Sequence, residues 1–72
     1  MIELDFWDER RGITIARASA HDLAAIPASG DGVYIPDAEQ SGAYLHLKVA
    51  SRQFYYSQEG ELVSIRLLCE VI

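Results

Sequence analysis

The chain holds few side chains of the kinds that carry out catalysis. Cys69 is the only cysteine, and His21 and His46 are the only histidines. A cysteine becomes a nucleophile only where a nearby base or a positive environment favours its thiolate. Cys69 is in phase with the apolar residues Leu67 and Val71, which predicts a strand that buries the thiol as a small hydrophobe. We therefore expect a protein that is not an enzyme.

Histidines and carboxylates are the other candidates for chemistry. His46 shares a predicted strand face with Tyr44 and Lys48, and no second histidine has the spacing that a metal site needs. Glu3 and Asp5 share a strand face, as a paired-carboxylate hydrolase requires, but a solvated outer face that discourages aggregation explains them more simply. The sequence predicts no catalytic residue, no metal ligand and no cofactor.

Aromatic side chains are the main recognition feature. Rings with a polar tip suit half-wet contacts with proteins, ligands or nucleobases. Base stacking works best beside a basic groove, and only Lys48, Arg52 and Arg66 are cations near these rings. A contact between copies of the chain explains the rings without a new partner. The predicted interface or binding residues are Trp7, Tyr34, Tyr44, His46, Phe54, Tyr56 and Leu68.

Size and charge restrict the partners. The 72 residues carry a net charge of -5, with 6 basic and 11 acidic residues, which argues against binding to a phosphate backbone. Hydrophobic residues make up 50% of the chain, yet a domain this small buries only about 60% of the surface that its unfolded chain exposes. One cysteine cannot form a stabilising disulfide within the chain. We therefore predict a single β domain over residues 1–72 that forms a homo-oligomer.

No segment has the pattern of a signal peptide or a membrane anchor. Residues 1–5 lack a basic region and a long apolar run, and no apolar stretch is long enough to span a bilayer. The single thiol fits a reducing compartment. We expect a cytoplasmic protein without membrane contact.

The first part of the chain predicts a hairpin and a short crossover. Residues 2–7 alternate apolar and acidic side chains, and residues 13–17 resume a β-branched pattern after a polar stretch that ends in glycine. Residues 19–26 resemble a helix start with Ser19 as the N-cap, and Pro27 ends it after about two turns. A helical turn or an irregular crossover fits this segment equally well.

The rest of the chain predicts a short strand and a long hairpin. Residues 33–35 form the short strand, and Pro36, which lacks a ladder donor, indicates a sheet edge or a strand end. In residues 43–72, apolar side chains recur at every second position on both sides of a turn near residues 57–60, which predicts the long hairpin.

The long hairpin has more apolar side chains than one face of a small sheet needs. Strict alternation puts Val63 on the core face and Leu62 on the other face. It also puts Phe54 and Tyr56 on that other face, although a bulge near residues 51–52 would return both to the core. The predicted fold is mainly β: a small, strongly twisted antiparallel sheet or SH3-like barrel of about five strands, with one short helical turn.

The last two-thirds of the chain resembles a known group of proteins. The residues that carry the resemblance are the stretch Gly-Asp-Gly-Val-Tyr-Ile-Pro at 30–36, then Tyr44, Val49, Arg52, Phe54 and Tyr56, then Val63, Ile65 and Leu67. This pattern is similar to that of small SH3-like β-barrel proteins of unknown function encoded on bacterial mobile elements such as phages and integron cassettes. The resemblance implies a small barrel and assigns no functional residue, because the group has no agreed chemistry.

Three functions compete on these features. The leading one is a non-enzymatic, self-associating interaction module that could also bind another protein, which the surplus of apolar side chains motivates. An acidic inhibitor or decoy that binds a basic host protein is an alternative, motivated by the negative charge and small size. The third is a small-molecule binding domain with an aromatic pocket.

Overall fold

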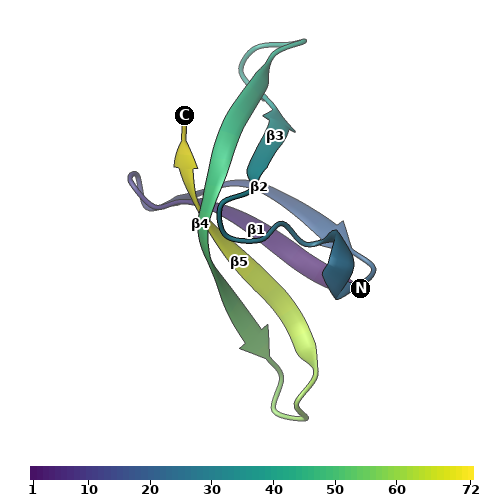
Figure 1. Cartoon of the computed structure of the whole chain (residues 1–72). Helices are drawn as coiled ribbons and strands as arrows, with labels where there is room; N and C mark the ends of the chain where they lie inside the picture. The colour runs from purple at the N-terminus through teal and green to yellow at the C-terminus, as the bar shows by residue number, and fades with distance from the viewer.

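The computed structural model describes all 72 residues, and their five strands form one sheet with the order β2-β1-β5-β4-β3. The sheet curls strongly into a half-barrel (Figure 1), which confirms the predicted mainly-β fold. The elements are β1 (Ile2–Asp8), β2 (Ile13–Ala20), the 3-10 turn η1 (Leu23–Ala25), β3 (Gly32–Pro36), β4 (Tyr44–Tyr56) and β5 (Leu62–Val71). No helix has the length and apolar character needed to cross a membrane.

One strand pair departs from the predicted antiparallel arrangement. β1 lies parallel to β5, with Leu4 opposite Ile65 and Phe6 opposite Leu67. The other three strand pairs are antiparallel. Alternation along a strand shows which side chains share a face, but it does not show which strand lies beside which. The sheet is therefore mixed, and its first and last strands are neighbours.

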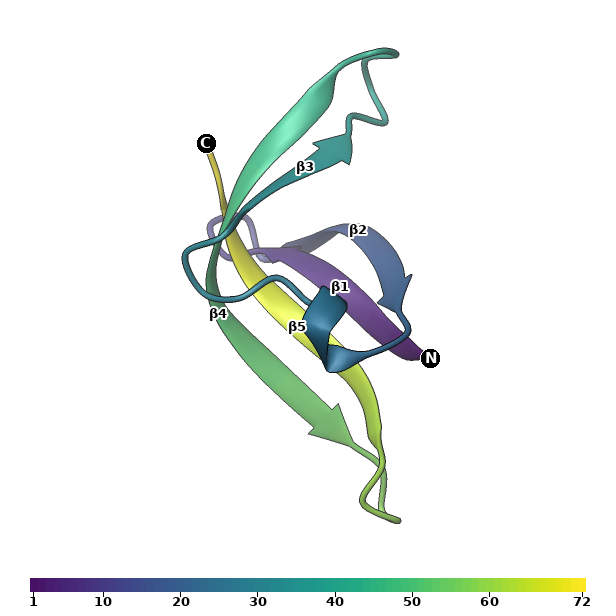
Figure 2. The same cartoon turned by 45° about the vertical axis from the view of Figure 1, so that its right-hand side comes forward.

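The core lies on the concave face of the curled sheet. The segment between β2 and β3 crosses this face (Figure 2) and contributes Ile26 to the core. Only 10 of the 72 residues are buried, so the core is small. Most of its members lie on β1, β4 and β5. Its apolar members are Leu4, Phe6, Ala20, Ile26, Leu47, Val49, Ile65, Leu67 and Cys69.

The crossover between β2 and β3 contains one 3-10 turn rather than a helix of two turns. Its cap is Asp22, whose side-chain oxygen accepts a hydrogen bond from the N–H of Ala25 at 3.2 Å. Ser19, the predicted cap, lies inside β2 instead. The cap prediction failed because β2 continues to Ala20 and leaves too few residues before Pro27 for a helix.

A bulge in β4 decides which side chains face the core. The register shifts between Val49 and Ser51, so Ala50 is the extra residue. As a result Phe54 lies opposite the buried Ile65 on the core face, as a bulge near this position predicts. Phe54 is still 42% exposed, because the ladder between β1 and β5 starts only at Ser64 and leaves the end of the β4–β5 hairpin without a neighbour.

A second register shift lies near the turn of the same hairpin. Tyr55 pairs with Ser64 and Tyr56 pairs with Leu62, so Val63 is the extra residue. Val63 is 44% exposed, whereas Leu62 packs against the core cluster. Strict alternation predicts the reverse, with Val63 on the core face and Leu62 on the other face. That prediction is wrong because the register shift reverses the alternation of β5 before Ser64.

Candidate functional site

The structure distributes the predicted interface residues over both faces of the sheet. Phe54 and Tyr56 follow the core face of β4, beside Ile65 and Leu62. The others lie on the convex face, because they alternate with buried core residues along their strands or pair with residues that do. These convex-face residues are Trp7, Tyr34, Tyr44, His46 and Leu68.

Three of them form an aromatic platform, Tyr34, Tyr44 and His46, on β3 and β4. Tyr34 lies opposite His46 with ring centroids 4.4 Å apart and ring planes 10° apart. A side chain at Gly32 would crowd this stack, because a Cβ there would lie 3.2 Å from Nε2 of His46. Tyr34 is 65% exposed and Tyr44 is 64% exposed. The platform therefore presents large flat rings to the surroundings, with their position fixed by the β3–β4 ladder.

The other end of the convex face is organised by Arg66. Its guanidinium carbon lies 4.2 Å from the ring centroid of Trp7 and 5.9 Å from that of Tyr55. Its Nε donates a hydrogen bond to Oδ2 of Asp5 at 3.2 Å. These contacts engage the charge of Arg66 within the protein. Trp7 in turn lies directly opposite Leu68, so the centre of the convex face combines apolar surface with one internal ion pair.

Tyr55 and Asp5 also lie on this face, although neither is among the predicted interface or binding residues. Tyr55 points to the convex face because the bulge at Ala50 reverses the alternation of β4. Asp5 has one carboxylate oxygen, Oδ1, that is buried and accepts no hydrogen bond from the chain. A buried acceptor without a donor is unfavourable, so this oxygen is an unused acceptor at the convex face. The run of three aromatic residues at 54–56 was the only sequence signal for Tyr55.

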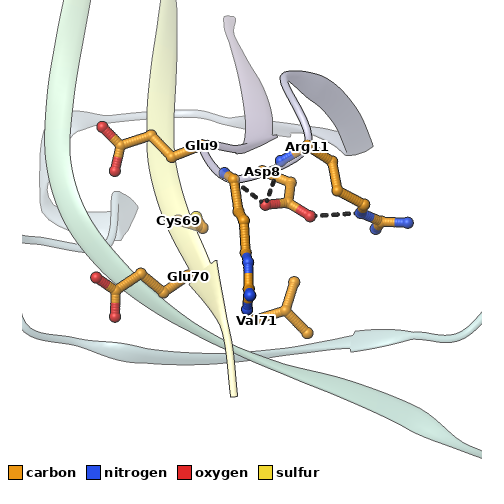
Figure 3. A pocket seen from close by; sticks show the side chains of 7 residues that line it. Asp8, Glu9, Arg11, Cys69, Glu70 and Val71 are labelled. Atoms are coloured by element: carbon orange, nitrogen blue, oxygen red, sulfur yellow. Dashed lines mark hydrogen bonds and ion pairs between the residues drawn. The ribbon is translucent and has the colours of Figure 1, made fainter.

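An open hollow lies beside the turn between β1 and β2 (Figure 3). Cys69 is fully buried at its floor, which confirms the predicted burial, and its thiol donates a hydrogen bond to the carbonyl of Leu67 at 3.2 Å. Burial raises the pKa of Cys69 to about 11, and the nearby negative charges of Asp8 and Glu9 act in the same direction. This environment disfavours a thiolate. The hollow contains none of the predicted aromatic residues; its lining is Asp8, Glu9, Arg10, Arg11, Cys69, Glu70 and Val71.

Asp8 holds the turn between β1 and β2 in place. Its Oδ1 accepts hydrogen bonds from the backbone N–H groups of Arg10 at 3.0 Å and Arg11 at 3.3 Å, and its Oδ2 accepts one from Nε of Arg11 at 2.6 Å. Its backbone carbonyl accepts a fourth from the N–H of Gly12 at 2.8 Å. The side-chain hydrogen bond from Arg11 lowers the pKa of Asp8, and this effect outweighs the opposing effect of burial.

The acid stability of the protein is expected to depend on Asp8. Because its pKa in the folded protein lies below the ordinary value of 3.8, the unfolded chain takes up the proton first as the pH falls. The stabilisation is therefore complete well above that value and is lost as the pH falls toward the folded pKa. Urea unfolding at pH 7 and at about pH 3 should show a larger loss of stability for the wild type than for Asp8→Asn. An equal loss in both proteins would contradict this role.

No candidate metal centre and no match to a known protein accompany this site. No group of three or more His, Cys, Asp or Glu side chains is placed to hold a metal ion. No family model, no curated protein and no solved structure matches the chain. The chain is a small five-stranded half-barrel with exposed aromatic rings and open strand edges.

Proposed function

We propose that this protein is a non-enzymatic interaction module that self-associates. The observation that carries the proposal is its surface area. The chain exposes 5058 Å², whereas a folded monomer of 8.0 kDa exposes about 4,450 Å² by the usual scaling of area with mass. The difference, about 600 Å², approaches the roughly 800 Å² that each partner buries in a standard interface.

The chemistry of the exposed surface supports a second copy as the partner. The aromatic platform on β3 and β4 and the rings at the end of the β4–β5 hairpin leave large apolar side chains uncovered. Exposed apolar surface of this kind marks interaction sites in soluble proteins, and aromatic rings are enriched among the residues that dominate binding. Because the core is small, burial against another copy also adds stability that the isolated chain lacks.

The resemblance to small proteins of bacterial mobile elements belongs to the same proposal. A five-stranded, strongly curled sheet supports it at the level of architecture, and a cytoplasmic location fits the buried, unpaired thiol. Neither feature assigns a partner outside the chain.

Removing one exposed ring is expected to weaken self-association. Tyr44→Ala deletes a ring that contacts little of its own protein, so the fold should persist while the dissociation constant rises about tenfold. Leu68→Asp places a charge at the centre of the convex face and should act in the same direction. Light scattering at micromolar concentration measures the mass of each protein.

Gln58→Ala, in the turn between β4 and β5, is the matched control and should keep the mass of the wild type. A wild type with the mass of one chain would refute self-association. A wild-type mass in both Tyr44→Ala and Leu68→Asp would remove the convex face from the interface.

A further inference from the structure

The sheet ends on two outer strands, β2 and β3, and β4 beyond Val49 also has no strand on its β3 side. β2 pairs only with β1, and β3 pairs only with β4 (Figure 2). In a closed barrel such edges pair with each other. An open edge presents unpaired N–H and C=O groups to which another strand can add.

β2 lacks most of the features that block the addition of a strand. After a bulge at Ile15, residues 16–20 read Ala-Arg-Ala-Ser-Ala, with no proline, no glycine and a single charge at Arg17. Small side chains also allow a second backbone to approach closely. β3 is shorter and ends at Pro36, which cannot donate to a ladder, so it can accept only a limited strand pairing. The two edges are therefore of different kinds.

The two edges also differ in charge. Residues 10–20, which include β2, contain three of the six basic residues, Arg10, Arg11 and Arg17, and no acidic one, and Asp8 and Glu9 come directly before them. Residues 28–43, which include β3, contain three acidic residues and no basic one. The ion pairs within the chain involve Arg11 and Arg66, so the side chains of Arg10 and Arg17 remain available to a partner. Pairing β2 with another β2 would bring like charges together, whereas pairing β2 with β3 brings opposite charges together.

We infer that β2 of one copy binds the β3 edge of a second copy, so that the copies associate head to tail; this inference rests on the proposed self-association. Antiparallel addition places the start of β2 beside the end of β3. Arg10, just before β2, then lies near Glu39, just after β3. The exposed side chains of Ile13 and Tyr34 lie on the same two strands and add apolar area to the contact. One such contact per pair of copies produces rings or open chains, whereas two reciprocal contacts close a two-fold dimer.

An exchange of charges between Arg10 and Glu39 tests the inference. Neither side chain takes part in the hydrogen bonds of its turn, because only the backbone N–H groups of Arg10 and Glu39 donate to Asp8 and Asp37. Arg10→Glu and Glu39→Lys should each raise the dissociation constant about tenfold at low salt, and the double variant should return toward the wild-type value. Sedimentation at a series of concentrations measures these constants. Glu59→Lys, at the turn between β4 and β5, makes the same charge change away from both edges and should leave association unchanged.

The outcomes separate this inference from the proposed function. Weaker association in each single variant with recovery in the double variant supports pairing of β2 with β3. An oligomer that is indifferent to both single variants, yet is disrupted by Tyr44→Ala, overturns the edge pairing and leaves self-association standing. A wild type that remains one chain at every concentration overturns both.

Discussion

Replacing Leu67 with alanine is expected to lower the free energy of unfolding by about 2–5 kcal/mol. Leu67 is fully buried near the centre of the sheet, opposite Phe6 on β1 and Arg52 on β4. The missing atoms would leave a cavity that the surrounding core side chains fill only in part. Small domains have total stabilities near the low end of about 5–15 kcal/mol, so a large part of the variant should be unfolded in water. Urea unfolding followed by Trp7 fluorescence, at one fixed protein concentration, measures the loss.

Val63→Ala is the matched control for Leu67→Ala. Both residues are aliphatic and lie on β5, and strict alternation assigns both to the core. In the structure Val63 is the exposed residue of a register shift, so its truncation should change the stability by no more than about 0.5 kcal/mol. A loss for Val63→Ala as large as that for Leu67→Ala would show that the register of β5 is wrong.

Cys69 is expected to react with a thiol reagent at least about a hundredfold more slowly in the folded protein than in the unfolded chain. The pKa of Cys69 rises from an ordinary value of 9.0 to about 11, which reduces the thiolate fraction, and the fully buried sulfur also blocks access. The absorbance change with an aromatic disulfide reagent at pH 8, with and without denaturant, measures both rates.

An exposed thiol provides the comparison for Cys69. The double variant Cys69→Ala and Ser41→Cys carries its one thiol in the exposed loop after β3, where it should react at the same rate with and without denaturant. Rapid labelling of Cys69 in the native wild type would contradict its burial and would reopen the hollow beside it as a reactive site.

Local patterns in the sequence predict the strands and one of the edges. The alternation over residues 2–7 corresponds to β1, which spans Ile2–Asp8. Pro36 indicates an edge or an end, and in the structure it is both, because it closes β3 at the border of the sheet. Both signals are local, because a single segment contains the period-two alternation and the proline that lacks a backbone N–H.

Sequence patterns do not predict features that depend on contacts between distant segments. The parallel pairing of β1 with β5 brings Arg66 over Trp7, and nothing in either segment alone indicates this neighbour. Aspartate is common in turns, but the role of Asp8 depends on how the turn between β1 and β2 closes onto its carboxylate. The bulge was foreseen as an option, but its position at Ala50 depends on pairing across two strands.

Sedimentation equilibrium of the full chain over the micromolar range tests self-association most directly. The area and the uncovered rings of the half-barrel predict an average mass that exceeds 8.0 kDa and rises with concentration. An average mass of 8.0 kDa at every concentration would contradict the account.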